Sequence, residues 1–133
     1  MGPILVADDN EAEACLVARA LREAGVSNEV HVVQDGESAI AFLERSRPCL
    51  VLLDQLLPAC SGLEVLDWLR RRSRTPTVPA LLLTASNRDA DIQAAYLVGA
   101  NGYLVKPTSF EDTVAMARAV KDYWLTFNRS PSL

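Results

Sequence analysis

The sequence predicts a doubly wound α/β fold, in which helices cover both faces of a parallel sheet. The chain has 133 residues, half of them apolar, which suits one compact domain. Short apolar runs recur along the chain, and stretches with helical spacing of apolar residues separate them. Strand and helix alternate five times, and the right-handed crossover rule converts that alternation into a parallel sheet.

Five short runs are the expected strands. Residues 4–7, 50–53, 80–83 and 103–105 are apolar, which predicts strands buried on both faces. The run 29–33 alternates polar and apolar residues at first, which predicts an edge strand with one wet side. His31, the single histidine, lies in this edge run, so we expect it to contact water.

Five helices are expected, each with a signal at one end. Gly25 and Gly99 follow the first and fourth helical stretches and are typical helix stops. The second helix is expected from about residue 35 to 46 and the third from 62 to 73. The last begins after Ser109, where the residues fit a capping box, and continues to about residue 127. We expect a single domain over residues 1–133, with a core of about 4–127, a frayed tail over 128–133 and no output domain.

Charge and composition exclude several classes of function. Lys plus Arg number 13 and Asp plus Glu 17, a net charge of −4 that argues against nucleic acid as the main ligand. A basic cluster is interpreted as decoration of a helix end, where cations are favoured: Arg70, Arg71, Arg72 and Arg74. Three cysteines are too far apart for a zinc site and are expected to be buried free thiols: Cys15, Cys49 and Cys60. No apolar run is long enough to span a bilayer, and we expect no membrane partner and a cytoplasmic protein.

Polar side chains follow the predicted central strands where each strand ends. Asp8 and Asp9 follow the first, Asp54 the third, Thr84 the fourth and Lys106 the fifth. The carboxyl ends of parallel strands share one rim of the sheet, where ligands collect. Each residue alone has a bland explanation as a cap or a solvated charge. Three carboxylates together repel one another unless a cation lies among them, and oxygen ligands favour a hard ion such as Mg²⁺. Lys106 and Thr84 suit the oxygens of a transferring phosphoryl group, with Asp54 as the candidate nucleophile.

These segments together resemble the receiver domain of two-component response regulators. The resemblance covers residues 4 to about 127 and rests on four separated motifs: residues 4–9, residues 52–58 with Gly62, residues 83–86 and residues 103–107. It implies the flavodoxin-like strand order 2-1-3-4-5, which makes the motif-bearing strands neighbours. It also implies a cis peptide at Lys106–Pro107, which the residues themselves leave open.

The resemblance further implies a role for each rim residue. Asp54 accepts a phosphoryl group from a kinase phosphohistidine, and Lys106 and Thr84 hold its oxygens. Asp9, Asp54 and the backbone carbonyl of Leu56 bind Mg²⁺ directly, and Asp8 acts through water. Movement of Thr84 leaves space that Tyr103 fills, which changes the surface formed by the fourth and fifth helices and the fifth strand. From the residues alone, Tyr103 could equally be an ordinary strand aromatic.

Two other classes of function are weighed against this one. A metal-dependent phosphohydrolase of the haloacid-dehalogenase type also uses an aspartate nucleophile, but it needs a second acid close behind, where this chain has Gln55 and Leu56. A receiver-like interaction module would keep the fold without accepting phosphate.

The apolar Leu56 replaces a residue that is polar in many relatives, which suggests the hypothesis of slow phosphoryl loss. Ser86 could modulate the same step.

The last predicted helix carries two apolar stripes. Phe110, Val114, Ala117 and Trp124 form one, and Met116, Val120, Tyr123 and Phe127 form the other. One stripe suffices to anchor a terminal helix, so the second predicts a homodimer interface, unless the tail over residues 128–133 covers it. Residues 122–126 also resemble the end of stand-alone regulators paired with phytochrome-type kinases, which implies a light-responsive histidine kinase as partner.

Overall fold

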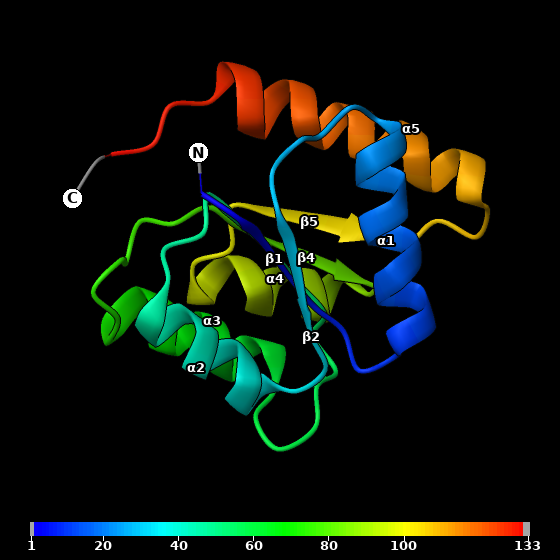
Figure 1. Ribbon diagram of the computed structural model, residues 1–133. Helices are drawn as coiled ribbons and strands as arrows, with labels where there is room; N and C mark the ends of the chain where they lie inside the picture. The colour runs from blue at the N-terminus through cyan, green and yellow to red at the C-terminus, as the bar shows by residue number, and fades with distance from the viewer. Residues whose placement is uncertain (1, 132–133) are drawn as a thin grey trace.

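A five-stranded parallel sheet with helices on both faces forms the fold (Figure 1). The computed structural model describes residues 2–131. The strands are β1 (Ile4–Ala7), β2 (Val30–Val33), β3 (Leu50–Leu53), β4 (Ala80–Thr84) and β5 (Gly102–Val105). Their order across the sheet is β2-β1-β3-β4-β5, with every neighbouring pair parallel, so the predicted fold class and strand order are confirmed.

Five helices connect and follow the strands, as predicted. They are α1 (Glu11–Glu23), α2 (Gly36–Arg45), α3 (Gly62–Arg71), α4 (Asp89–Val98) and α5 (Phe110–Val120), and a π-helical segment, Lys121–Phe127, continues α5. Polar side chains cap four N-termini by accepting a backbone hydrogen bond: Asn10, Asp35, Ser61 and Ser109. Gly25 and Gly99 have φ angles of 92° and 118°, a left-handed conformation that ends α1 and α4 at low cost.

Two hydrophobic clusters, one on each face of the sheet, form the core. Because successive strand residues point to opposite faces, Leu5 and Val51 join a cluster with residues of α2, α3 and α4. Their neighbours Ile4 and Leu52 join a second cluster with residues of α1 and α5. Figure 1 shows the corresponding layers, with α1 and α5 on one side of the sheet and the other three helices opposite. None of the helices within residues 2–131 has the length and apolar character needed to cross a membrane.

The two edge strands differ from the expectations in part. β5 was expected to be buried on both faces, but its residues are half-buried and Val105 is exposed, because β5 lies at a sheet edge with one strand neighbour. β2 is the other edge strand, as predicted. His31 of β2 is half-buried and stacks on Phe42 of α2, with ring centroids 4.4 Å apart, so it packs against an aromatic ring as well as facing water.

The side chains of the arginine cluster differ in their exposure to solvent. Arg71 is exposed and pairs with Asp67 at 2.9 Å. Arg70 instead turns inward at the end of α3 and donates four hydrogen bonds to neutral acceptors of the β4 approach and the α4–β5 loop: Pro76 O, Val78 O, Gly99 O and Asn101 Oδ1. The prediction was therefore wrong for Arg70, which ties three segments together at the amino ends of the strands.

The cysteines are free, as expected, but none is fully buried: Cys15 is exposed, and Cys49 and Cys60 are half-buried. Cys15 lies on the solvent side of α1, since Ala14 and Val17 take the core-facing positions. The peptide bonds of the described residues are all trans, Lys106–Pro107 included. Of the expected tail, residues 132–133 lie outside the described part, and the Pro131 carbonyl accepts a hydrogen bond of 2.8 Å from Arg47.

Candidate functional site

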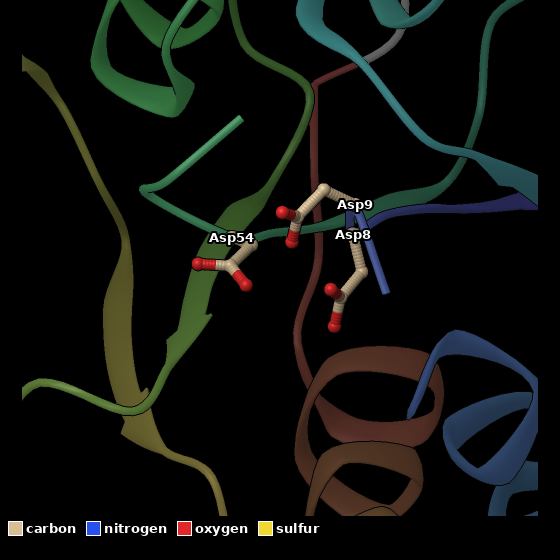
Figure 2. Close-up of side chains that lie close together, drawn as sticks. All are labelled: Asp8, Asp9 and Asp54. Carbon is tan, nitrogen blue, oxygen red and sulfur yellow. The ribbon is translucent and has the colours of Figure 1, made fainter. Parts of the chain in front are cut away.

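Three carboxyl groups gather where β1 and β3 end (Figure 2). β1 and β3 are hydrogen-bonded neighbours, so Asp8 and Asp9 after β1 and Asp54 after β3 reach the same point of the rim. One carboxylate oxygen from each lies within 4.8 Å of those of the other two. Asp8 and Asp54 are 3% and 6% exposed, whereas Asp9 is open to solvent. A set of oxygen ligands with one open side fits a hard divalent cation.

Lys106 carries the positive charge of this cluster. Its Nζ atom lies 2.8 Å from Asp8 Oδ2 and 2.8 Å from Asp54 Oδ2, although Lys106 follows the edge strand β5. The remaining oxygens of the two aspartates accept backbone hydrogen bonds: Asn10 N donates to Asp8 Oδ1 at 3.0 Å and Leu56 N to Asp54 Oδ1 at 3.1 Å. Both oxygens of each buried carboxylate are therefore hydrogen-bonded, as burial of a charge requires.

The buried charges perturb one another unequally. Burial raises the pKa of Asp8, and the hydrogen bonds from Lys106 and Asn10 offset this only in part. Burial by itself would lower the pKa of Lys106, but hydrogen bonds to Asp54, Asp8 and Glu13 outweigh it and raise that pKa. The hydrogen bonds outweigh burial at Lys106 but not at Asp8 because Lys106 contacts three carboxylates, whereas Asp8 contacts one ammonium group. Lys106 is thus held in its charged form.

Thr84 and Tyr103 lie beside the loops that follow β3 and β4. Thr84, the last residue of β4, is 1% exposed and lines a cavity of about 280 Å³ together with Leu56 and Ser86. The Tyr103 hydroxyl donates to the Ser86 carbonyl at 3.0 Å and lies 3.4 Å from Gln55 Oε1. The ring is half-buried and packs against the cluster of the α2–α4 face. Tyr103 is therefore tied to the two loops that flank Thr84.

Leu56 reaches the edge of the same cavity, as its place two residues after Asp54 suggested. Its side chain is 75% exposed although it is apolar. On the far side of the cavity the Ser86 hydroxyl donates to Asp91 Oδ2, and Arg88 pairs with the same carboxylate at 3.1 Å. The hydrogen bonds from Ser86 and Arg88 lower the pKa of Asp91. Asp91 and Arg88 were not singled out from the sequence, because their contacts depend on the turn that begins α4.

Glu13 is a member of the charge cluster that the sequence analysis missed. Its Oε1 atom lies 2.6 Å from Lys106 Nζ. Glu13 lies in the first turn of α1, where its backbone N–H donates to the cap residue Asn10 at 3.0 Å. An acidic residue in the first turn after an acidic strand end was the available signal, since that turn starts at the same rim.

The second apolar stripe of the last helix is divided by the structure. Tyr123 and Phe127 are exposed, at 54% and 74%, and Met116 is half-buried. Val120, in contrast, is 4% exposed and belongs to the core cluster on the α1–α5 face, so it was wrongly assigned to a surface stripe. Val120 lies three residues after the buried Ala117 and shares its face of α5. The π-helical winding from Lys121 onward changes the helical spacing only for the residues that follow, Tyr123 and Phe127 among them.

A doubly wound sheet with three carboxylates and a lysine at its carboxyl rim defines the class of domains that accept a phosphoryl group on an aspartate. Residues 4–118 match the family model described as the response regulator receiver domain, and this chain belongs to that family. It is a signalling protein of two-component systems, a class whose receivers are phosphorylated by histidine kinases and bind divalent metal ions, rather than a conventional enzyme.

Three related proteins illustrate the similarity. The probable methanogenesis regulatory protein FilR2 of Methanothrix harundinacea is 40% identical, over 96% of this chain and 86% of that protein. Rcp1 of Synechocystis is 32% identical over 92% of this chain and 88% of its own length. The Mn²⁺-bound structure of response regulator Rcp1 superposes with a TM-score of 0.88 at 30% identity and covers 99% of this chain and 100% of that one. The phosphorylated cyanobacterial phytochrome response regulator RcpA gives a TM-score of 0.90 at 30% identity, covering 98% and 99%.

Proposed function

We propose that Asp54 is the phosphoacceptor of a single receiver domain formed by residues 4–127, and that Mg²⁺ is the ion held by Asp8, Asp9 and Asp54. The observation that carries this proposal is the Lys106 ammonium, bonded at 2.8 Å to the carboxylates of both Asp54 and Asp8 within a cluster that spans 4.8 Å. The backbone carbonyl of Leu56 is the proposed additional metal ligand, and Asp8 would act through water. The ion would supply charge neutralisation for the incoming phosphoryl oxygens.

The transfer uses groups already present at the rim. An oxygen of the Asp54 carboxylate attacks the phosphorus of the kinase phosphohistidine, and the phosphorus–nitrogen bond breaks. The electron pair stays on that imidazole nitrogen, and because the other ring nitrogen carries a proton, the kinase histidine leaves as neutral imidazole and the receiver supplies no proton. Lys106 moves one donor from Asp54 to a phosphoryl oxygen, and the Thr84 hydroxyl donates to another. Because Gln55 and Leu56 offer no acid behind the nucleophile, we do not expect turnover of phosphate esters.

The phosphorylated state is expected to change the surface of α4, β5 and α5. Thr84 leaves its resting position to reach the phosphoryl group, and the Tyr103 ring moves into the space beside it. This movement breaks the 3.0 Å bond between the Tyr103 hydroxyl and the Ser86 carbonyl. The loop between β4 and α4 is then free to rearrange, which transmits the change from the rim to α4.

Mass spectrometry after incubation with acetyl phosphate and Mg²⁺ tests the assignment of Asp54. We expect one added phosphoryl group on the wild-type protein and none on Asp54→Asn. Self-phosphorylation from this small donor needs the carboxylate and the ion but no kinase. An adduct of equal yield in both proteins would overturn the site assignment, and no adduct in either would favour the receiver-like interaction module.

The partners follow from two further features. A phytochrome-type histidine kinase is the proposed donor, supported by the similarity to RcpA, which is a phytochrome response regulator.

A homodimer is proposed through the exposed Tyr123 and Phe127, with Met116 at the margin, because two exposed aromatics on one helical segment favour burial against a second copy. Size-exclusion chromatography with light scattering tests it: we expect a dimer that Phe127→Ser weakens. A concentration-independent monomer of the wild type contradicts the proposal.

A further inference from the structure

The Lys106 ammonium has no unused donor in this structure. A lysine ammonium offers three N–H groups. Its Nζ atom has three carboxylate partners, Asp8 and Asp54 at 2.8 Å and Glu13 at 2.6 Å. The Lys106 side chain is 17% exposed, so water has little access to it. Lys106 is therefore shared between the acidic cluster and the first turn of α1.

Two of these three partners are the carboxylates that a divalent ion needs. Asp8 and Asp54 belong to the cluster with the metal-ligand geometry, and each already gives one oxygen to Lys106 and the other to a backbone N–H. An ion bound there and the ammonium compete for the same oxygens. Glu13 lies outside that cluster, on α1, and its side chain is 48% exposed. Of the three acceptors of Lys106, Glu13 is therefore the one that the ion would not bind.

We propose that Glu13 is a positioning residue, which keeps hold of the Lys106 ammonium when a divalent ion occupies Asp8 and Asp54. Lys106 then stays beside Asp54 with donors free for an incoming phosphoryl group. This inference rests on the proposed metal site. It deepens that proposal, because it explains how one site can hold both a lysine on its acids and a metal ion on the same acids.

The position of Glu13 is fixed well enough for this role. Its backbone is pinned by the cap residue Asn10, and its side chain lines a groove of about 450 Å³ between α1 and α5 that Lys106 and Pro107 also line. Glu11 offers a matched control in the same helical turn. Its carboxylate accepts instead from Gln34 Nε2 at 2.6 Å, on the side of α1 next to the end of β2.

Metal affinity gives a readout that does not depend on phosphorylation. We expect Glu13→Gln to weaken Mg²⁺ binding about fivefold, which corresponds to about 1 kcal/mol, because a displaced ammonium then has only a neutral acceptor. Glu11→Gln removes the same charge without touching Lys106 and is expected to weaken binding less than about 1.5-fold. In a Lys106→Met background, the effect of Glu13→Gln should fall to that of Glu11→Gln.

Either of two results overturns the inference. One is an equal effect of the Glu13 and Glu11 substitutions. The other is an unchanged effect of Glu13→Gln when Lys106 is replaced, which would mean that Glu13 acts on the ion through space. Since no phosphoryl donor is used, failure of Asp54 phosphorylation leaves this measurement able to decide the role of Glu13.

A second measurement avoids the Lys106 substitution, which could destabilise the buried acids. The chain has two lysines, Lys106 and Lys121, so isotope-labelled lysine gives two assignable signals in an NMR spectrum. With saturating Mg²⁺, the two ε-methylene protons of Lys106 should stay inequivalent in the wild type and merge in Glu13→Ala, as those of a mobile side chain do. Merged signals in the wild type would show that Lys106 is released, and would overturn the inference.

Discussion

Replacing Arg70 with methionine should destabilise the protein far more than the same change at Arg71, although the two are neighbours in α3. The Arg70 guanidinium donates hydrogen bonds of 2.7 to 3.0 Å to the acceptors Pro76 O, Val78 O, Gly99 O and Asn101 Oδ1. Burial lowers the pKa of Arg70, which marks a charge held partly out of water without a carboxylate partner. The contribution of Arg70 to the free energy of unfolding therefore comes from these hydrogen bonds.

The magnitude follows from the bonds and the exposure. A hydrogen bond to a charged group contributes about 1.5 kcal/mol at the low end of the usual range, so four such bonds at full strength would contribute about 6 kcal/mol. Arg70 is half-buried, and water can replace the guanidinium at some acceptors, so we expect about 3 kcal/mol for Arg70→Met. Arg71→Met removes an exposed ion pair with Asp67 at 2.9 Å, which is expected to cost less than about 0.5 kcal/mol.

Urea denaturation followed by circular dichroism measures both free energies of unfolding. Arg70→Lys provides a third point: it keeps the charge but loses the planar fork that reaches several acceptors, so we expect a loss close to that of methionine. If Arg70→Met and Arg71→Met agree within about 0.5 kcal/mol, the proposed tie between α3, the β4 approach and the α4–β5 loop carries no stability and the reasoning is refuted.

Three further predictions address the cavity, a helix start and a low-pH titration. Leu56→Asn should speed decay of the phosphorylated protein, timed by phosphate release, because a polar side chain admits and orients water; an unchanged rate removes the idea. Gly36→Ala should destabilise the protein by more than about 2 kcal/mol in urea although alanine favours helices, since a Cβ would lie 1.9 Å from the Cys60 carbonyl oxygen; stabilisation would show that the loop yields. The hydrogen bond from Ser86 helps to lower the pKa of Asp91 below 3.8, so its stabilisation is complete above pH 3.8 and is lost as pH falls through the lowered pKa. An NMR titration of Asp91 should give a midpoint below 3.8 that Ser86→Ala raises, and a midpoint unmoved by that change would contradict the bond.

The sequence by itself determined the sheet and the main members of the rim. Uninterrupted apolar runs predict buried parallel strands, and the residue after each run is placed by the strand end, whatever the packing of the helices. Asp8, Asp54 and Lys106 meet for that reason, although Lys106 lies 52 residues from Asp54 along the chain. The local sequence also determined the helix ends at Gly25 and Gly99, since a left-handed backbone favours glycine.

Only the tertiary structure decided how side chains beyond the strand ends are used. Arg70 and Arg71 read alike in the sequence, and the packing of α3 beside the α4–β5 loop sends one inward and leaves the other in water. Val120 belongs to the core because it lies three residues after Ala117, on the face of α5 that packs against the sheet. Glu13 contacts Lys106 because α1 starts at the rim where β1 ends and the Lys106 side chain reaches Glu13 there, although the two residues lie 93 positions apart in the sequence. The positions of residues at strand ends follow from the pairing of the strands in the sheet, whereas these contacts depend on how separate elements pack.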